Sequence, residues 1–329
     1  MDAVKNEKLM ERLKGSQYEG MVESFVSSDD EIEFDCQRCG KCCMHRDTAE
    51  DAIYISPLDI YNGAKELKMD VPSFAEKYIA FNIGPTSKVA VATLACNEYG
   101  ACKLLEFEKS GLAKCRIHKA KPTICAIHPL GITHFDEDGP DKDSKIYAFV
   151  GGCEKSKTGT MVKVRDIAST VCGTDEEIDM ALKVRVGWFD GLDWAFIRNT
   201  LSLSFALAVS RLDVISYNRI SISNKTYKLS KSIANSLEKQ IGKFDFALTL
   251  ESISQTGQLL DAIHNKNMYE SYYNYDTNKP FLEQCERNYH ELVEFAKNVK
   301  NISDVYFKAI TENMTPAQVE GVKRFIKEL

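Results

Sequence analysis

The sequence lacks the features that mark several common classes of protein. Its most apolar window, residues 201–210, is about ten residues long, whereas a transmembrane helix needs roughly 20. It has no sustained basic run, and its 42 Lys and Arg against 48 Asp and Glu give a formal net charge of −6. A nucleic-acid-binding surface is usually strongly basic. We therefore expect neither a membrane span nor a nucleic-acid partner.

Signals for export, repetition and common catalytic chemistry are also missing. Residues 1–15 are mixed in charge and lack the apolar core of a secretory signal, so the sequence predicts a cytoplasmic protein. We find no internal repeat, no HExxH zinc motif and no recognisable Ser-His-Asp set. No residue is therefore assigned a catalytic role.

Cysteine, by contrast, is abundant and unevenly placed. Nine of the 11 cysteines lie between Cys36 and Cys153, and the other two are Cys172 and Cys285. In a reducing cytoplasm, clustered thiols bind metals or act in catalysis more often than they form disulfides. The cluster therefore predicts a metal site, with disulfides as the alternative, while Cys172 and Cys285 are expected to be ordinary core or surface thiols.

The strongest local signal is the run Cys36-x2-Cys39-Gly40-x-Cys42-Cys43. Two-residue spacing lets a tight turn direct successive thiolates at one ion, and Gly40 supplies the backbone freedom that the turn needs. The first three spacings match a bacterial ferredoxin, although the nearby fourth Cys-Pro is absent, and Cys-x-x-Cys-Gly is equally typical of zinc knuckles. Because one site needs only four ligands and neighbouring side chains diverge, two sites and one site with spare cysteines both stay open.

Local patterns predict an α+β fold, with a small metal-organised, cysteine-rich domain of short strands and helices followed by an α-helical domain. We place an N-terminal helix and acidic connector at 1–30, the cysteine-cluster domain at 31–173 and the helical domain at 174–329. Alternating polar and apolar residues or β-type runs predict strands at 31–35, 89–93 and 145–150. Capping signals and helical periodicity predict helices at 57–68, 72–80, 175–187, 192–213, 230–240, 244–265, 280–299, 303–312 and 316–328.

Several of these segments together resemble a known family, the YkgJ-type cysteine-cluster proteins with a CxxCxxCC zinc- or iron-chelating domain. The resemblance covers roughly residues 34–170. It rests on the cysteine run, the helix start at 55–60, Cys102-Lys-Leu-Leu, Cys115-Arg-Ile-His118, Lys121-Pro-x2-Cys125-x3-Pro-Leu and the late Cys153. Lys121 stands where the family usually has Arg, and Ala126 and His128 also depart from its common pattern.

The resemblance implies a metal centre and a set of ligands. The family's eight cysteines correspond to Cys36, Cys39, Cys42, Cys43, Cys102, Cys115, Cys125 and Cys153. Three further candidates come from this sequence itself: Cys96 lies outside the eight, and His118 and His128 each end a Cys-x-x-His arrangement that could complete a mixed site. The expected cofactor is an iron–sulfur cluster or zinc.

Three functions are compatible with these residues. The first is a cytoplasmic metal-binding protein with an iron–sulfur or zinc centre and an unidentified protein partner or substrate. The second is an enzyme that uses the centre, because some members of the family are described as flagellin lysine-N-methylases, which would require S-adenosylmethionine. The sequence has neither a G-x-G-x-G loop after a strand nor a C-x3-C-x2-C radical motif. The third is a structural zinc module for protein assembly.

Overall fold

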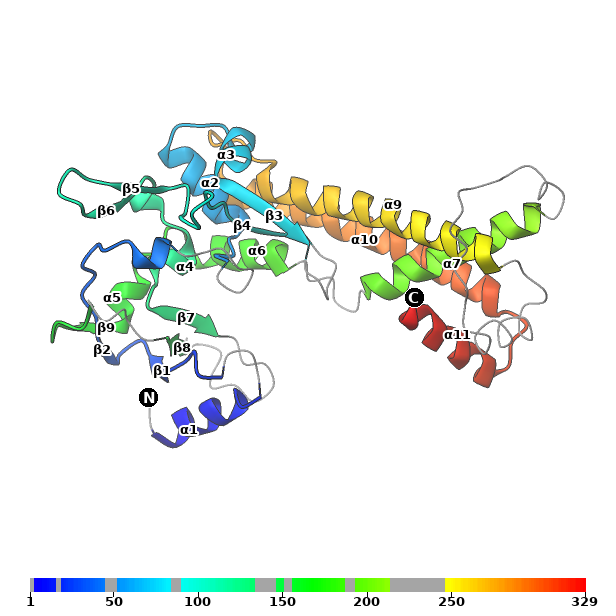
Figure 1. Ribbon diagram of the computed structural model, residues 1–329, viewed down its shortest axis with the longest axis horizontal. Coiled ribbons are helices and arrows are strands. Elements are labelled where there is room, and N and C mark those ends of the chain that lie inside the picture. The colour runs from blue at the N-terminus through cyan, green and yellow to red at the C-terminus, as the bar shows by residue number, and fades with distance from the viewer. Residues whose placement is uncertain are drawn as a thin grey trace. The chain divides into compact units, whose positions relative to one another are not determined.

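The computed structural model describes residues 3–15, 19–44, 52–83, 90–133, 146–150, 156–186, 193–213 and 246–329. The chain divides into two compact units that alternate along the sequence (Figure 1). The first comprises residues 1–82, 92–185 and 272–285, so it extends past residue 173, and the second comprises residues 83–91, 186–271 and 286–329. Short antiparallel strands are followed by long helices, which confirms the predicted α+β class.

The strands of the first unit form small antiparallel sheets. The largest has the order β1 (Ser24–Ser27), β8 (Ile146–Phe149), β7 (Leu130–Thr133), with β8 in the middle. Three two-stranded sheets complete the set in the described part of the chain: β2 (Glu31–Glu33) with β9 (Met161–Lys163), β3 (Ile79–Ile83) with β4 (Ala90–Leu94), and β5 (Leu105–Phe107) with β6 (Ala113–Cys115). The strands predicted at 31–35, 89–93 and 145–150 are confirmed as β2, β4 and β8.

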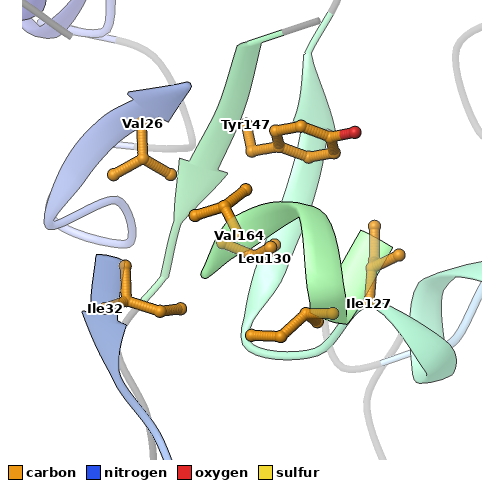
Figure 2. Close-up of a cluster of buried hydrophobic side chains, with 7 residues drawn as sticks. Val26, Ile32, Ile127, Leu130, Tyr147 and Val164 are labelled. Carbon is orange, nitrogen blue, oxygen red and sulfur yellow. The ribbon is translucent and has the colours of Figure 1, made fainter. Parts of the chain in front are cut away.

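A buried apolar cluster joins the three-stranded sheet to β2 and to the helix α5 (Val164–Ala168), as Figure 2 shows. Strands β1, β2, β7 and β8, the helix α5 and one loop residue contribute its members, which are Val26, Ile32, Ile127, Leu130, Tyr147, Val164 and Ile167. Ile127 and Leu130 enclose the short segment between α4 (Thr123–Ala126) and β7, and each is at most 2% exposed. Burial of such side chains stabilises a fold by about 2 kcal/mol each, so this cluster holds the segment that carries Cys125 and His128.

The described helices of the first unit are α1 (Ala3–Arg12), α2 (Pro57–Glu66), α3 (Val71–Tyr78), α4, α5 and α6 (Asp175–Val186), with short 3-10 turns at Lys41–Cys43 and His118–Ala120. The starts of α2, α3 and α6 lie within one residue of the predicted starts, whereas the short helices α4 and α5 were not predicted. Ser56 caps α2 through a capping box with Asp59. Gly63 of α2 lies against the ring of Phe74 on α3, and a Cβ there would come within 2.5 Å of that ring. These two helices therefore pack closely.

Among the described residues, four helices contribute to the second unit: α7 (Trp194–Asp213), α9 (Phe246–Tyr273), α10 (Phe281–Thr311) and α11 (Pro316–Glu328). The prediction of separate helices at 280–299 and 303–312 is wrong, because α10 runs unbroken through both. Ser303 is 1% exposed inside the helix, and an ion pair of 2.6 Å between Lys300 and Asp304 spans the predicted gap. The helix predicted at 230–240 lies outside the described residues. None of the helices in the described part of the chain is long and apolar enough to cross a membrane.

The core of the second unit combines apolar packing with buried polar groups. Its apolar cluster contains Leu203, Ala206, Ile253, Val322 and Ile326. Elsewhere in the unit, the indole of Trp194 stacks on the imidazole of His264 with ring centres 4.0 Å apart. Asp261 accepts a hydrogen bond of 3.1 Å from the Trp194 indole and pairs at 3.0 Å with Arg198. The helices are thus joined by aliphatic contacts at one place and by an aromatic and ionic group at another.

Candidate metal centre

The cysteine run folds as a tight turn rather than as a regular element. Arg38 has a positive φ of 49° and Gly40 one of 76°, which together reverse the chain between Cys39 and Cys42. The amide of Cys43 closes the turn by donating to the carbonyl of Gly40 at 2.9 Å. A side chain at Gly40 would be strained by its φ and would meet Ala113 Cβ at 3.0 Å. Glycine is therefore required here for both conformation and space.

Arg38 fastens this turn to the β5 and β6 hairpin. Its carbonyl accepts from the Ala113 amide at 2.7 Å, and its Nε donates to the Ala113 carbonyl at 3.1 Å. Its guanidinium also pairs with Glu108 in the loop of the hairpin. A further backbone bond of 2.9 Å runs from the Cys102 amide to the Cys43 carbonyl. The turn is therefore held against segments that lie some 60 to 75 residues later in the chain.

Cys125 is positioned by a buried carboxylate at the start of α4. Asp59 is 7% exposed, and its Oδ2 accepts from the amide and hydroxyl of Ser56 at 2.7 and 2.8 Å. Its Oδ1 accepts from the amide and hydroxyl of Thr123 at 2.7 and 3.1 Å. One carboxylate thus caps α2 and also holds the helix turn that carries Cys125. The sequence signals the first role through the Ser56-Pro-Leu-Asp59 pattern but gives no sign of the second.

The cysteine side chains line two adjoining cavities. The larger has a volume of about 330 Å³, and its cysteines are Cys42, Cys43, Cys96, Cys102, Cys115 and Cys125. The smaller has a volume of about 110 Å³, and its cysteines are Cys36, Cys39, Cys42, Cys43 and Cys115. Three thiols, those of Cys42, Cys43 and Cys115, line both cavities. Two of these, Cys42 and Cys43, have sulfur atoms 3.9 Å apart.

Burial and mutual repulsion keep the deeper thiols protonated in the protein alone. Burial raises the pKa of Cys102 to about 11, and the nearby Cys115 and Cys96 add to the rise. Burial also raises the pKa of Cys125, with further contributions from Cys102, Asp59, Cys115 and Cys42. A metal ion would reverse this balance, because a coordinated thiol loses its proton to the metal's positive charge.

Lys121 is a cation beside the thiols, and its charge affects the pKa of two neighbouring side chains. It lines both cavities, and its charge acts to lower the pKa of Cys115, opposing the larger upward effect of burial. The same charge is the largest cause of a lowered pKa at His118, followed by burial and by Arg38 and Lys114. This role is visible only in the structure, because the sequence shows Lys121 simply as a departure from an expected Arg.

The structure places most of the predicted ligands together. Seven of the eight cysteines implied by the resemblance line the cavities, and Cys153 lies outside the described residues. Cys96 lines the larger cavity, His118 the smaller and His128 both. Cys172 lies elsewhere, with its Sγ donating to the Lys119 carbonyl at 2.7 Å, and Cys285 is fully buried on α10.

The donor set fits a thiophilic metal by its chemistry, because zinc and iron–sulfur clusters are bound chiefly by cysteine thiolates. In the described part of the chain, however, no three Cys, His, Asp or Glu side chains are grouped tightly enough to hold an ion. The cysteines are thus gathered around common cavities without forming a closed coordination shell among the described residues.

Fold and site together define a cysteine-rich domain of the α+β class whose thiols gather around two cavities. Residues 35–153 match the sequence model of the CxxCxxCC family, described as "Putative zinc- or iron-chelating domain". This match confirms the resemblance over the matched range, which contains all nine clustered cysteines. No curated protein and no solved structure matches the chain.

Proposed function

We propose that the chain is a cytoplasmic metal-binding protein that holds a cysteine-ligated iron–sulfur centre, with zinc as the alternative metal. The ligands come from Cys36, Cys39, Cys42, Cys43, Cys102, Cys115, Cys125 and Cys153, with Cys96, His118 and His128 beside them. The observation that carries the proposal is that thiols from four separate parts of the chain line two adjoining cavities. The match to a zinc- or iron-chelating family supports it independently.

The size of the larger cavity favours a cluster over a single zinc ion. The cavity has far more room than one ion needs, since the share of liquid volume that one water molecule occupies is about 30 Å³. The eight described thiols exceed the four that either a zinc site or one iron–sulfur cluster uses, so their number allows a second centre or spare thiols with either metal. An iron–sulfur cluster bound there would supply electron transfer or Lewis-acid chemistry.

The residues of the chain prepare the site in three ways. Arg38 and Asp59 fix the backbone segments that carry the thiols. Lys121 offsets negative charge near Cys115. Apolar side chains, including Leu94, Leu104 and Leu130, line the larger cavity beside the half-buried Cys102 and Cys125, whereas Cys36 and Cys42 are exposed. Partial burial strengthens coordination by the thiolates of Cys102 and Cys125, because electrostatic interactions are less screened away from bulk water.

Metal analysis of protein purified without oxygen tests the proposal. We expect iron and acid-labile sulfide in matched amounts, and absorbance near 400 nm that bleaches with dithionite. Cys39→Ser should lose most of the metal. Cys172→Ser is the matched control, because a serine there can still donate to the Lys119 carbonyl, and it should keep its metal. Zinc without iron would identify the alternative metal, and equal metal content in the two variants would contradict the assigned ligands.

The larger cavity also favours a second candidate, an enzyme that acts on a substrate beside the centre. Its apolar wall, which includes Ile53, Ile124 and Val150, provides binding surface that a purely structural metal site does not need. Methyl transfer is the activity that the family resemblance suggests, with S-adenosylmethionine as donor. Titration calorimetry on the metal-loaded protein tests this activity. If S-adenosylmethionine produces no heat of binding, the methylase hypothesis is contradicted.

A further inference from the structure

Cys96 and Cys102 face each other across a short antiparallel bridge. The Asn97 amide donates to the Ala101 carbonyl at 2.8 Å, and the Lys103 amide donates to the Ala95 carbonyl at 2.9 Å. These bonds flank the cysteine pair on both sides and leave it as a non-hydrogen-bonded pair. In such pairs the Cα atoms lie about 4.5 Å apart and the side chains approach most closely, on the same side of the ribbon.

This spacing lies within the range that a disulfide requires. Cα atoms of bridged cysteines are usually about 4.4 to 6.8 Å apart. Both cysteines line the larger cavity, so their side chains lie on a common surface. Either sulfur could therefore reach the other by a change of side-chain rotamer, without movement of the backbone.

The loop between the two cysteines is itself well held. The Asn97 side chain accepts hydrogen bonds of 3.0 Å from the amides of Tyr99 and Ala101. The Gly100 amide donates to the Asn97 carbonyl at 3.0 Å, and Gly100 has the positive φ of 71° that this turn requires. The two cysteines are thus kept opposite each other in the reduced protein, which is the preorganisation that a reversible disulfide needs.

We propose that Cys96 and Cys102 form a thiol–disulfide pair that controls metal binding. The thiolate of Cys96 attacks a small disulfide such as oxidised glutathione, forming a mixed disulfide and releasing one small thiolate. That small thiolate takes the proton of the Cys102 thiol, and the Cys102 thiolate then attacks the protein sulfur of the mixed disulfide and releases the second small thiolate. Two protein thiols are thereby oxidised to one disulfide, while the small disulfide is reduced to two thiols.

The consequence for the metal rests on the proposed function. A cysteine binds a metal as its thiolate, so Cys102 cannot coordinate the metal while its sulfur is held in a disulfide. The Cys102 amide is bonded to the Cys43 carbonyl, which places this event beside the CxxCxxCC turn. Cys96 is thus assigned the role of a redox partner for a ligand rather than that of a ninth ligand.

Peptide mapping tests the disulfide without reference to any metal. Cleavage after Lys88 and Lys103 releases residues 89–103, which contain Cys96 and Cys102 and no other cysteine. After treatment of the full chain with oxidised glutathione and alkylation of remaining thiols, this peptide should be two hydrogen atoms lighter than its reduced form and unalkylated. Alkylation at both positions, or a disulfide from either cysteine to another peptide, would overturn the proposal.

Metal retention tests the second step. Oxidised glutathione should release most of the bound metal from the wild-type protein and leave it bound in Cys96→Ser, where no partner for Cys102 remains. Equal release from both proteins would overturn the coupling to metal. If the untreated protein binds no metal, the proposed function fails, whereas the mass of residues 89–103 still decides whether the disulfide forms.

Discussion

The first unit gathers thiols around cavities, whereas the second packs apolar and aromatic side chains between long helices. The regular elements around the cysteines are short, and β5, β6 and α4 have three, three and four residues. In the second unit, α10 alone has 31 residues. Short elements bury little apolar surface, so the difference indicates that the cysteine-bearing segments depend on cross-links that the helices do not need.

Metal removal should produce the largest difference in stability between the two units. Structural metals contribute on the order of 10 kcal/mol to the folding of small domains. We therefore expect a chelator, applied under reducing conditions, to abolish most of the amide protection in residues 36–43 and 96–126. Residues 253–326 should keep their protection. Hydrogen exchange followed by mass spectrometry measures both regions in one sample, and equal loss in both would show that the helical core also depends on the metal.

Acid, unlike metal removal, should destabilise the second unit, because it contains the buried His264. This imidazole is 1% exposed and lies between Trp194 and Phe295, and neither ring nitrogen has a hydrogen-bond partner among the described residues. Burial lowers the pKa of His264 to about 4, although the charge of Asp261 acts to raise it. A histidine in the unfolded chain has a pKa near 6.5. Between pH 6.5 and 4, therefore, this imidazole is protonated in the unfolded chain and neutral in the folded unit.

The stability supplied by neutral His264 is fully present above pH 6.5 and is lost as the pH falls towards 4. The loss amounts to about 3 kcal/mol, at 1.36 kcal/mol per unit of pKa. Urea titrations followed by circular dichroism at pH 7 and 4.5 should show a smaller decline for His264→Phe than for the wild type. His290→Phe serves as the control, since His290 is exposed on α10 and its replacement leaves the buried imidazole of His264 in place, so the wild-type decline should be retained. Identical declines in all three proteins would contradict this role of His264.

Sequence patterns predict features that neighbouring residues determine better than features that depend on contacts between distant segments. Helix starts were readable wherever a cap was present, as at Ser56 and Thr315, because a capping box uses neighbouring residues only. The break expected at residues 300–302 was wrong, because α10 continues through them and the ion pair between Lys300 and Asp304 spans one helical turn there. The ligand set was suggested by cysteine spacing, but the functions of Arg38, Asp59 and Lys121 depend on contacts between distant segments, which no local pattern encodes.

Asp59 offers the finest test of how the first unit positions its thiols. Asp59→Asn keeps the shape of the side chain but replaces one acceptor oxygen by a donor, so two of the four donors from Ser56 and Thr123 lose their partner. Leaving buried donors unpaired costs on the order of 2 kcal/mol. Metal affinity should fall as well, because α4 carries Cys125. Competition with a coloured chelator measures that affinity.

Asp70→Asn provides the matched control for this substitution. Asp70 caps α3 through a hydrogen bond of 2.8 Å from the Ser73 amide, so its carboxylate serves α3, whereas that of Asp59 also holds α4. The amide oxygen of asparagine can accept the same bond, so both stability and metal affinity should change less than in Asp59→Asn. If the two variants lose metal affinity equally, Asp59 acts as a helix cap alone, and the position of Cys125 must be set by the apolar cluster around Ile127 and Leu130.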